Sequence, residues 1–126
     1  MPFETRFDPE TGILFAIVLD DFTLEEFEKG LQDLAGSAEV PASVPTLWDM
    51  TRMDFHLMDN NRLEHMLEIR LKYPARGRAR LAMLVNSRLQ FGVSRMYEML
   101  SESRGLPQSI QVFYDRQEAV DWLTGA

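Results

Sequence analysis

The sequence predicts a single α/β domain, spanning residues 1–126, with a five-stranded mixed sheet and about four helices. Buried-strand patterns alternate with amphipathic helix patterns along nearly the whole chain, as expected for strands joined through helices. A chain of 126 residues is long enough for one domain with a hydrophobic core, but two domains would each be too small. Cysteine is absent, which excludes disulfide scaffolds, thiol catalysis and zinc–thiolate sites.

The chain begins with two predicted strands. Residues 3–7 alternate apolar and polar side chains, which predicts a half-exposed edge strand. After the turn sequence of residues 8–12, the continuous apolar run 13–19 predicts a central strand. The short turn implies that the two strands pair antiparallel.

The first helix is predicted to begin at Thr23, which forms a capping box with Glu26. It carries apolar residues at helical spacing and is expected to end at Gly36, before a loop that extends to Pro45. The apolar positions are Leu24, Phe27, Leu31 and Leu34.

The next strand ends near Asp49, and Asp59 or Asn60 is placed to cap a second helix that Pro74 stops. Residues 80–85 form another buried-strand pattern. The core side of the second helix is predicted to carry Leu63, Met66, Leu67 and residues 69–71.

Ser87 is predicted to cap the third helix, with Gly92 allowing close approach to the sheet. Its predicted inner face consists of Leu89, Val93, Met96, Tyr97 and Leu100. Residues 109–114 form a border strand, and Asp115 begins a short final helix. The predicted order is β-β-α-β-α-β-α-β-α, with right-handed parallel crossovers.

Composition narrows the function classes. The formal net charge of −7 argues against sequence-independent nucleic-acid binding. No apolar run approaches the roughly 18 residues that a bilayer span requires, so no stable membrane insertion is expected. The first residues lack the pattern of a secretory leader, and we expect a cytoplasmic protein.

Basic residues nevertheless gather around the end of the second helix. This cluster is either a cationic helix terminus with a solvated loop, or a docking patch for an acidic partner. It consists of Arg70, Lys72, Arg76, Arg78 and Arg80.

The main candidate site is the rim where Asp49 ends a buried parallel strand, because α/β folds bind ligands at the carboxyl ends of such strands. A connection rich in Met and aromatic residues follows, and it is expected to cover the core, form a dimer or partner contact, or line an apolar pocket. The start of the third helix is expected to contribute free backbone N–H groups and the positive charge of Arg88 to the same rim. The candidate rim residues are Asp49, Thr51, Arg52, Met53, Asp54, Phe55, Met58, Ser87 and Arg88.

The sequence contains no pattern that predicts catalysis, a cofactor or a metal. No nucleophile and general base stand together near the rim. His56 and His65 lack the spacing of metal ligands, and no glycine-rich phosphate loop is present. We therefore predict neither an enzyme nor a bound cofactor.

Several segments together resemble the SpoIIAA-like family of STAS and CRAL-TRIO-type domains, a family whose members are largely uncharacterised. The resemblance spans nearly the whole chain, and it depends on the order and spacing of the matching segments. The segments are residues 45–51, 80–82 with 91–98, 112–115, and 118–119 with 122–123.

We expect a non-enzymatic regulatory or protein-interaction module that forms a homodimer, with another protein as a further partner. The alternative is a binder of a small apolar or lipid-like ligand. STAS-type regulators place a phosphoacceptor Ser after an Asp at the start of the second helix, and Asp59-Asn60 is the counterpart here. Because Asn carries no hydroxyl, the usual phosphorylation switch is not expected at this place.

Overall fold

The computed structural model describes residues 3–19, 22–35, 43–53, 55, 58–73 and 79–125. The described elements follow the predicted order of strands and helices. They are β1 (Phe3–Asp8), β2 (Ile13–Val18), α1 (Leu24–Ala35), β3 (Thr46–Asp49), α2 (Asn60–Leu71), β4 (Leu81–Leu84), α3 (Arg88–Ser103), β5 (Ile110–Phe113) and α4 (Arg116–Thr124). The predicted α/β layout with a five-stranded mixed sheet and four helices is confirmed. The predicted end of the first helix at Gly36 and the loop after it lie largely outside the described residues.

The strands form one sheet in the order β1-β2-β3-β4-β5. The β1–β2 hairpin is antiparallel, with Phe3 opposite Val18. The remaining three pairings are parallel, with Leu14 opposite Thr46 and Leu81 opposite Ile110 among the register pairs. Strands β1 and β5 are therefore the two edges of the sheet.

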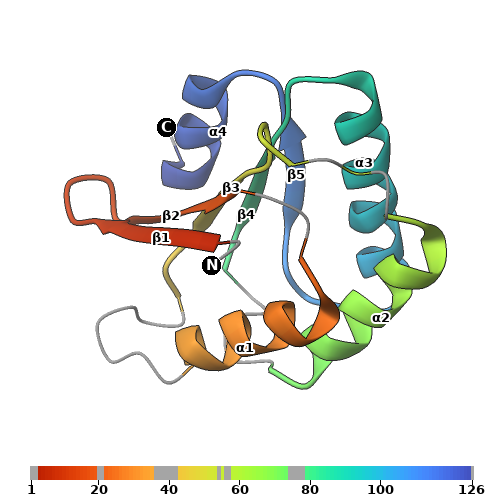
Figure 1. Cartoon of the computed structure of the whole chain (residues 1–126). Coiled ribbons are helices and arrows are strands. Elements are labelled where there is room, and N and C mark those ends of the chain that lie inside the picture. Colours follow the sequence, from red (N-terminus) through yellow and green to blue (C-terminus); the bar gives the residue numbers. More distant parts are fainter. Residues whose placement is uncertain are drawn as a thin grey trace.

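The strand order explains how the helices are distributed. The three connections from β2 to β5 all step in the same direction across the sheet. Because such crossovers are right-handed, their helices must lie on one face. Figure 1 shows α1, α2 and α3 on that face, whereas α4, which follows the last strand, lies against the other.

The larger core lies between the sheet and α1, α2 and α3. It includes buried side chains from all three connections, such as Phe27, Leu67 and Tyr97. Aromatic rings continue it toward the hairpin: Phe22 stacks on Phe27, and Phe27 meets the edge of Trp48. At 25 cal/mol per Å² of apolar area, burial of each such side chain contributes about 1.5–3 kcal/mol to stability.

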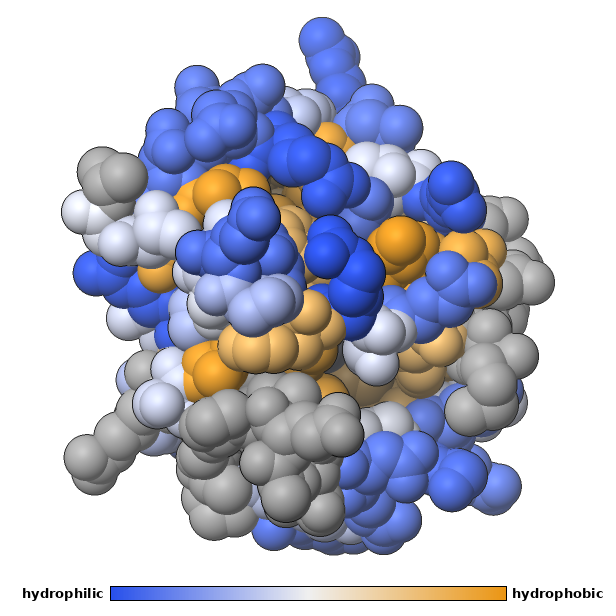
Figure 2. All heavy atoms as spheres, turned by 90° about the vertical axis from the view of Figure 1, so that its left-hand side faces the viewer, coloured by the Kyte–Doolittle hydropathy of each residue, from blue (hydrophilic) through white to orange (hydrophobic). Residues whose placement is uncertain are grey.

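A smaller core lies under α4. Ala82 of β4 and Ala119 of α4 are both fully buried, which lets the helix approach the sheet closely. Phe113 and Trp122 pack beside them with ring centroids 5.7 Å apart. The face of the molecule drawn in Figure 2 is covered largely by hydrophilic residues, with smaller hydrophobic areas between them.

Side-chain caps start the helices where the sequence predicts them. The Thr23 hydroxyl accepts from the Glu26 amide at 3.0 Å, and a Glu26 carboxylate oxygen accepts from the Thr23 amide at 2.9 Å. Asp59, Ser87 and Asp115 cap α2, α3 and α4, each by accepting a hydrogen bond from the backbone amide three residues later. Of the two predicted caps for α2, Asp59 is the one used.

The predicted inner face of α3 is partly wrong. Leu89 and Met96 are exposed, and the helix buries Gln90, Ser94, Tyr97 and Ser101. Gly92 is exposed as well, and a Cβ added there would meet no atom within 4 Å, so it does not lie against the sheet. On α2, Leu71 also lies outside the core, with 47% of its surface exposed.

Candidate functional site

Asp49 lies at the carboxyl end of β3 and is only 8% exposed. One carboxylate oxygen accepts from the Thr51 backbone amide at 3.1 Å and from the Thr51 hydroxyl at 2.7 Å. The other accepts from the Arg116 guanidinium at 2.6 Å. Asp49 therefore fixes the turn that follows β3 and ties it to the first residue of α4.

Gln90 holds the same connection from the side of α3. Its amide nitrogen donates to the backbone carbonyls of Thr51 at 3.3 Å and Met53 at 3.2 Å. Its amide oxygen accepts from the Asn86 backbone amide at 2.8 Å. Gln90 is buried. Its hydrogen bonds satisfy backbone groups that would otherwise be shielded from water with no hydrogen-bond partner.

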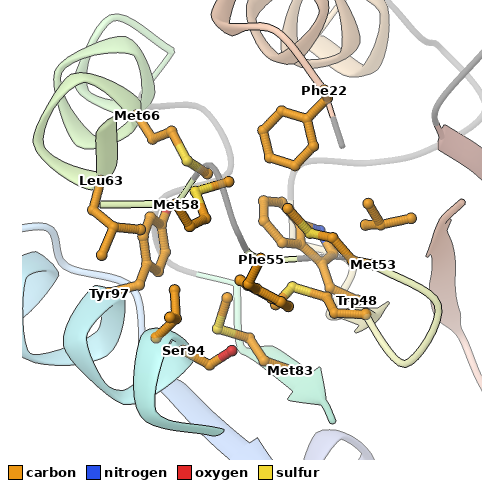
Figure 3. Close-up of a pocket in the computed structure, with 13 residues that line it drawn as sticks. Phe22, Trp48, Met53, Phe55, Met58, Leu63, Met66, Met83, Ser94 and Tyr97 are labelled. Carbon is orange, nitrogen blue, oxygen red and sulfur yellow. The ribbon is translucent and has the colours of Figure 1, made fainter. Parts of the chain in front are cut away.

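The Met-rich connection contributes to the core. Met53 and Phe55 are each 5% exposed, and Met58 is half-buried against them. Together with Met66 and Met83, these side chains surround a cavity of about 20 Å³ (Figure 3). A space of this size holds about one water molecule.

Ser94 is the polar member of that lining. Its hydroxyl is buried without a hydrogen-bond partner among the described residues. The rest of the wall is aromatic, aliphatic or thioether in character (Figure 3). Because a buried water needs two or more polar partners, one hydroxyl does not suffice to hold it.

Three further predicted rim residues lie at the surface. Arg52, Ser87 and Arg88 are exposed, and Asp54 lies outside the described residues. The Ser87 hydroxyl accepts from the Gln90 backbone amide at 3.1 Å and so caps its own helix. The rim thus combines an organised interior with an exposed edge that extends onto α3.

Sequence reasoning misses Arg116 and Gln90 as parts of this rim. Both follow helix caps, but a cap does not reveal which strand end its neighbours meet. Arg116 meets Asp49 because α4 packs across β3 and β4 on the face opposite the crossover helices. The contact depends on a strand order that local patterns do not specify.

The exposed side of α3 is the least expected part of the surface. Leu89, Met96 and Met99 are exposed by 59%, 42% and 59% of their surface. Exposure repeats every seven residues: positions 88, 89, 92, 95, 96, 99, 102 and 103 are exposed, and those between them are buried or half-buried. We call these eight positions the outer face of α3. The seven-residue spacing of Leu89 with Met96 and of Gly92 with Met99 is the sequence signal for it.

The described members of the basic cluster are already engaged. The Arg70 guanidinium is buried, where it donates to the Tyr97 hydroxyl and to the Gln108 amide oxygen. Lys72 pairs with Glu28 at 3.8 Å, and Arg80 lies over the Trp122 ring at 5.2 Å. Arg76 and Arg78 lie outside the described residues.

A wider, open hollow of about 340 Å³ lies between α3, β5 and α4. Arg80 and Glu98 are among its lining residues. Arg80 donates to the Trp122 carbonyl at 2.5 Å, and Glu98 pairs with Arg95 at 2.5 Å. These charges are therefore committed to contacts within the chain.

Two displaced pKa values belong to groups away from the rim. Hydrogen bonds from the Thr11 hydroxyl and the Glu10 amide lower the pKa of Asp8 in the hairpin turn. Donation to the Glu28 carboxylate raises the pKa of Tyr73, which follows α2. Within the described part of the chain, no group of three or more His, Asp or Glu side chains is arranged to hold a metal ion.

Comparison with protein-family models, curated proteins and solved structures finds no match for this chain. Among the described helices, none combines the length and apolarity of a membrane span. We therefore infer function from the geometry of the rim and of α3.

Proposed function

We propose that this chain is a SpoIIAA-like, STAS-type regulatory module that acts by binding protein rather than by catalysis. The outer face of α3 carries this proposal. An amphipathic helix usually turns its apolar side chains toward the core. Helix α3 buries Tyr97 in this way, but it also exposes three large apolar side chains, namely Leu89, Met96 and Met99. An exposed apolar stripe on a capped, 16-residue helix fits a contact with another polypeptide.

The strand order supports a binding role over a catalytic one. In open α/β sheets, a ligand crevice forms where successive crossovers step in opposite directions. Here β2, β3, β4 and β5 follow one another without reversal. The polar groups nearest the strand ends are Asp49 and Gln90. Their hydrogen bonds are made within the chain, where they stabilise the rim.

The start of α2 supports a regulator without the phosphorylation switch. An Asp59 carboxylate oxygen accepts from the Arg62 backbone amide at 2.8 Å, so this side chain is engaged in capping. The next residue is Asn60. No hydroxyl stands at this position, and a control by partner availability or concentration fits the chain better than phosphorylation.

A photo-activatable cross-linking residue at position 99 tests the proposal in the cells that produce the protein. We expect light-dependent protein adducts from position 99. A matched probe at Gln117, exposed on α4 across the sheet, should give none. If position 99 yields no protein adduct, or if both positions yield the same adducts, the exposed stripe is not a protein-binding surface and the proposal is wrong.

The second candidate is a binder of a small apolar ligand, and the Met-lined cavity favours it. At about 20 Å³ the cavity is far below the size of drug-like ligand pockets, so Met53 and Met58 would have to move aside. Native mass spectrometry of gently purified protein provides the test. A retained apolar compound would support this function, and protein that carries none would exclude it.

A further inference from the structure

We infer that the partner of α3 is a second copy of this chain, with the two helices packed antiparallel about a two-fold axis level with residue 94. This inference rests on the proposed function, because it names the occupant of the same outer face. Side-chain size, charge and the cost of a glycine each point to this arrangement.

The first argument is size. In an antiparallel helix pair with a heptad pattern, each core position of one helix faces its counterpart in the reversed partner. With the axis at residue 94, Leu89 faces Met99 of the second copy, and Gly92 faces Met96. The smallest exposed residue therefore receives a long, adaptable thioether side chain, and the pattern repeats on both sides of the axis.

The second argument is charge. Residues 88, 95 and 102 form the column beside the apolar stripe, and all three are exposed. The reversed partner brings Glu102 of one copy beside Arg88 of the other, twice per dimer. At the axis Arg95 would meet its own copy, but each Arg95 is paired with Glu98 of its own helix at 2.5 Å. Opposite charges thus flank the stripe at both ends.

The third argument is Gly92. Glycine inside a helix costs about 0.5–1 kcal/mol relative to alanine. Nothing lies within 4 Å of the position that a Cβ would take, so packing within the described chain does not require this glycine. A closely approaching second helix explains its presence.

A parallel pair fits less well. It would place Gly92 opposite Gly92 and leave a void between the helices, while Met96 would face Met96. It would also leave Arg88 14 residues, or about 21 Å along the helix, away from Glu102 of the second helix. Only the antiparallel register joins large to small and positive to negative.

Sedimentation equilibrium over a wide concentration range tests the second copy as the partner. An interface built on one helix pair is small, so we expect a reversible dimer in the micromolar range. Arg88→Glu and Glu102→Arg should each weaken the dimer about tenfold, and the double variant should restore it. Met99→Glu should abolish it. Leu71→Glu, at an exposed leucine on α2, is the matched control and should leave it unchanged.

The absence of native cysteine makes the register directly testable. In the antiparallel pair, a mixture of the L89C and M99C variants should form a disulfide-linked dimer under mild oxidation. Either variant alone should not, because its two sulfur atoms would lie about 15 Å apart along the helices. Efficient cross-linking of L89C with itself would overturn the antiparallel register.

The outcomes separate this inference from the proposed function. If the protein stays monomeric at all concentrations while position 99 captures a different protein in cells, the second copy is the wrong partner and the binding role stands. If position 99 captures nothing and no dimer forms, both fail. Thermal unfolding of each variant shows that a lost dimer does not reflect a lost fold.

Discussion

Single polar side chains fix the carboxyl edge of the sheet. Asp49 engages Thr51 with one oxygen and Arg116 with the other, and Gln90 satisfies three backbone groups of the same edge. Both side chains are buried. If either is replaced, the groups to which it is hydrogen-bonded would lose that bond, and water could not take its place. The geometry of the rim depends on these two residues.

Replacement of Asp49 separates its two contacts. Asp49→Asn keeps an acceptor for Thr51 but loses the charge that attracts Arg116, whose side chain is half exposed, so we expect a loss of about 1 kcal/mol. Asp49→Ala also leaves the Thr51 groups without their acceptor and should cost about 2–3 kcal/mol. Urea unfolding measures both. Equal losses for the two variants would contradict the role of Asp49 in the turn.

Tyr73 provides a pH-dependent contact between α1 and α2. Its hydroxyl donates to Glu28 at 2.7 Å, which raises its pKa, and it accepts from Gln32 at 2.8 Å. Because the folded state favours the protonated phenol, this contribution to stability is present below the unfolded pKa of about 10. It is lost as the pH rises through the higher folded value.

A phenolate absorbance titration checks this prediction. One of the three tyrosines should titrate above the ordinary range, and Tyr73→Phe should remove that transition. Glu28→Gln should return it toward the ordinary value, since the neutral amide attracts the phenol proton less. A high transition that persists in Tyr73→Phe would assign the shift to another tyrosine.

Among the helices, α3 combines two faces that differ from the usual arrangement. Tyr97 and the half-buried Val93 and Leu100 supply apolar contacts with the core, while Gln90, Ser94 and Ser101 add polar groups to the buried side. The outer face keeps Leu89, Met96 and Met99 in water. A helix of this kind is stabilised within one chain and remains able to bind a second.

Gly92→Ala tests the position of Gly92 on that outer face. Alanine restricts the unfolded chain and meets no atom within 4 Å in the fold, so the monomer should gain about 0.5–1 kcal/mol. Thermal unfolding at low protein concentration measures this. A destabilised monomer would place Gly92 against the sheet, as the sequence pattern predicts.

The whole fold is a three-layer sandwich with unequal outer layers. Three crossover helices cover one face of the sheet, and among the described helices α4 alone covers part of the other (Figure 1). The contact between α4 and the sheet depends on the small, fully buried side chains of Ala82 and Ala119. The smaller core has little room to adjust.

Ala119→Leu should therefore destabilise the whole domain. Extra side-chain volume in a closely packed layer costs about 1–3 kcal/mol, and the loss should appear in a single cooperative unfolding transition. Gln117→Leu, at an exposed position of the same helix, is the control and should change stability by less than about 0.5 kcal/mol. If both variants behave alike, α4 does not pack as the structure shows.

Local sequence patterns were sufficient to predict the helices and strands and their order along the chain. Caps such as Thr23 and Ser87, the apolar run of β2 and the hairpin turn act over a few residues, so their physical cause lies within the local sequence. The structural role of Asp49 at the strand end could likewise be predicted, because an acidic side chain before a turn most often accepts backbone hydrogen bonds.

The three-dimensional packing settled the faces and the partners. Leu89 and Met96 have helical spacing with Val93 and Leu100, yet only the latter two pack against the core, because α3 is rotated to bury Gln90 over the rim. The sequence pattern does not show this rotation, since apolar residues lie on both sides of the helix. The Asp49–Arg116 pair joins residues 67 positions apart. Contacts of this range follow from strand order and layer packing, which no local pattern specifies.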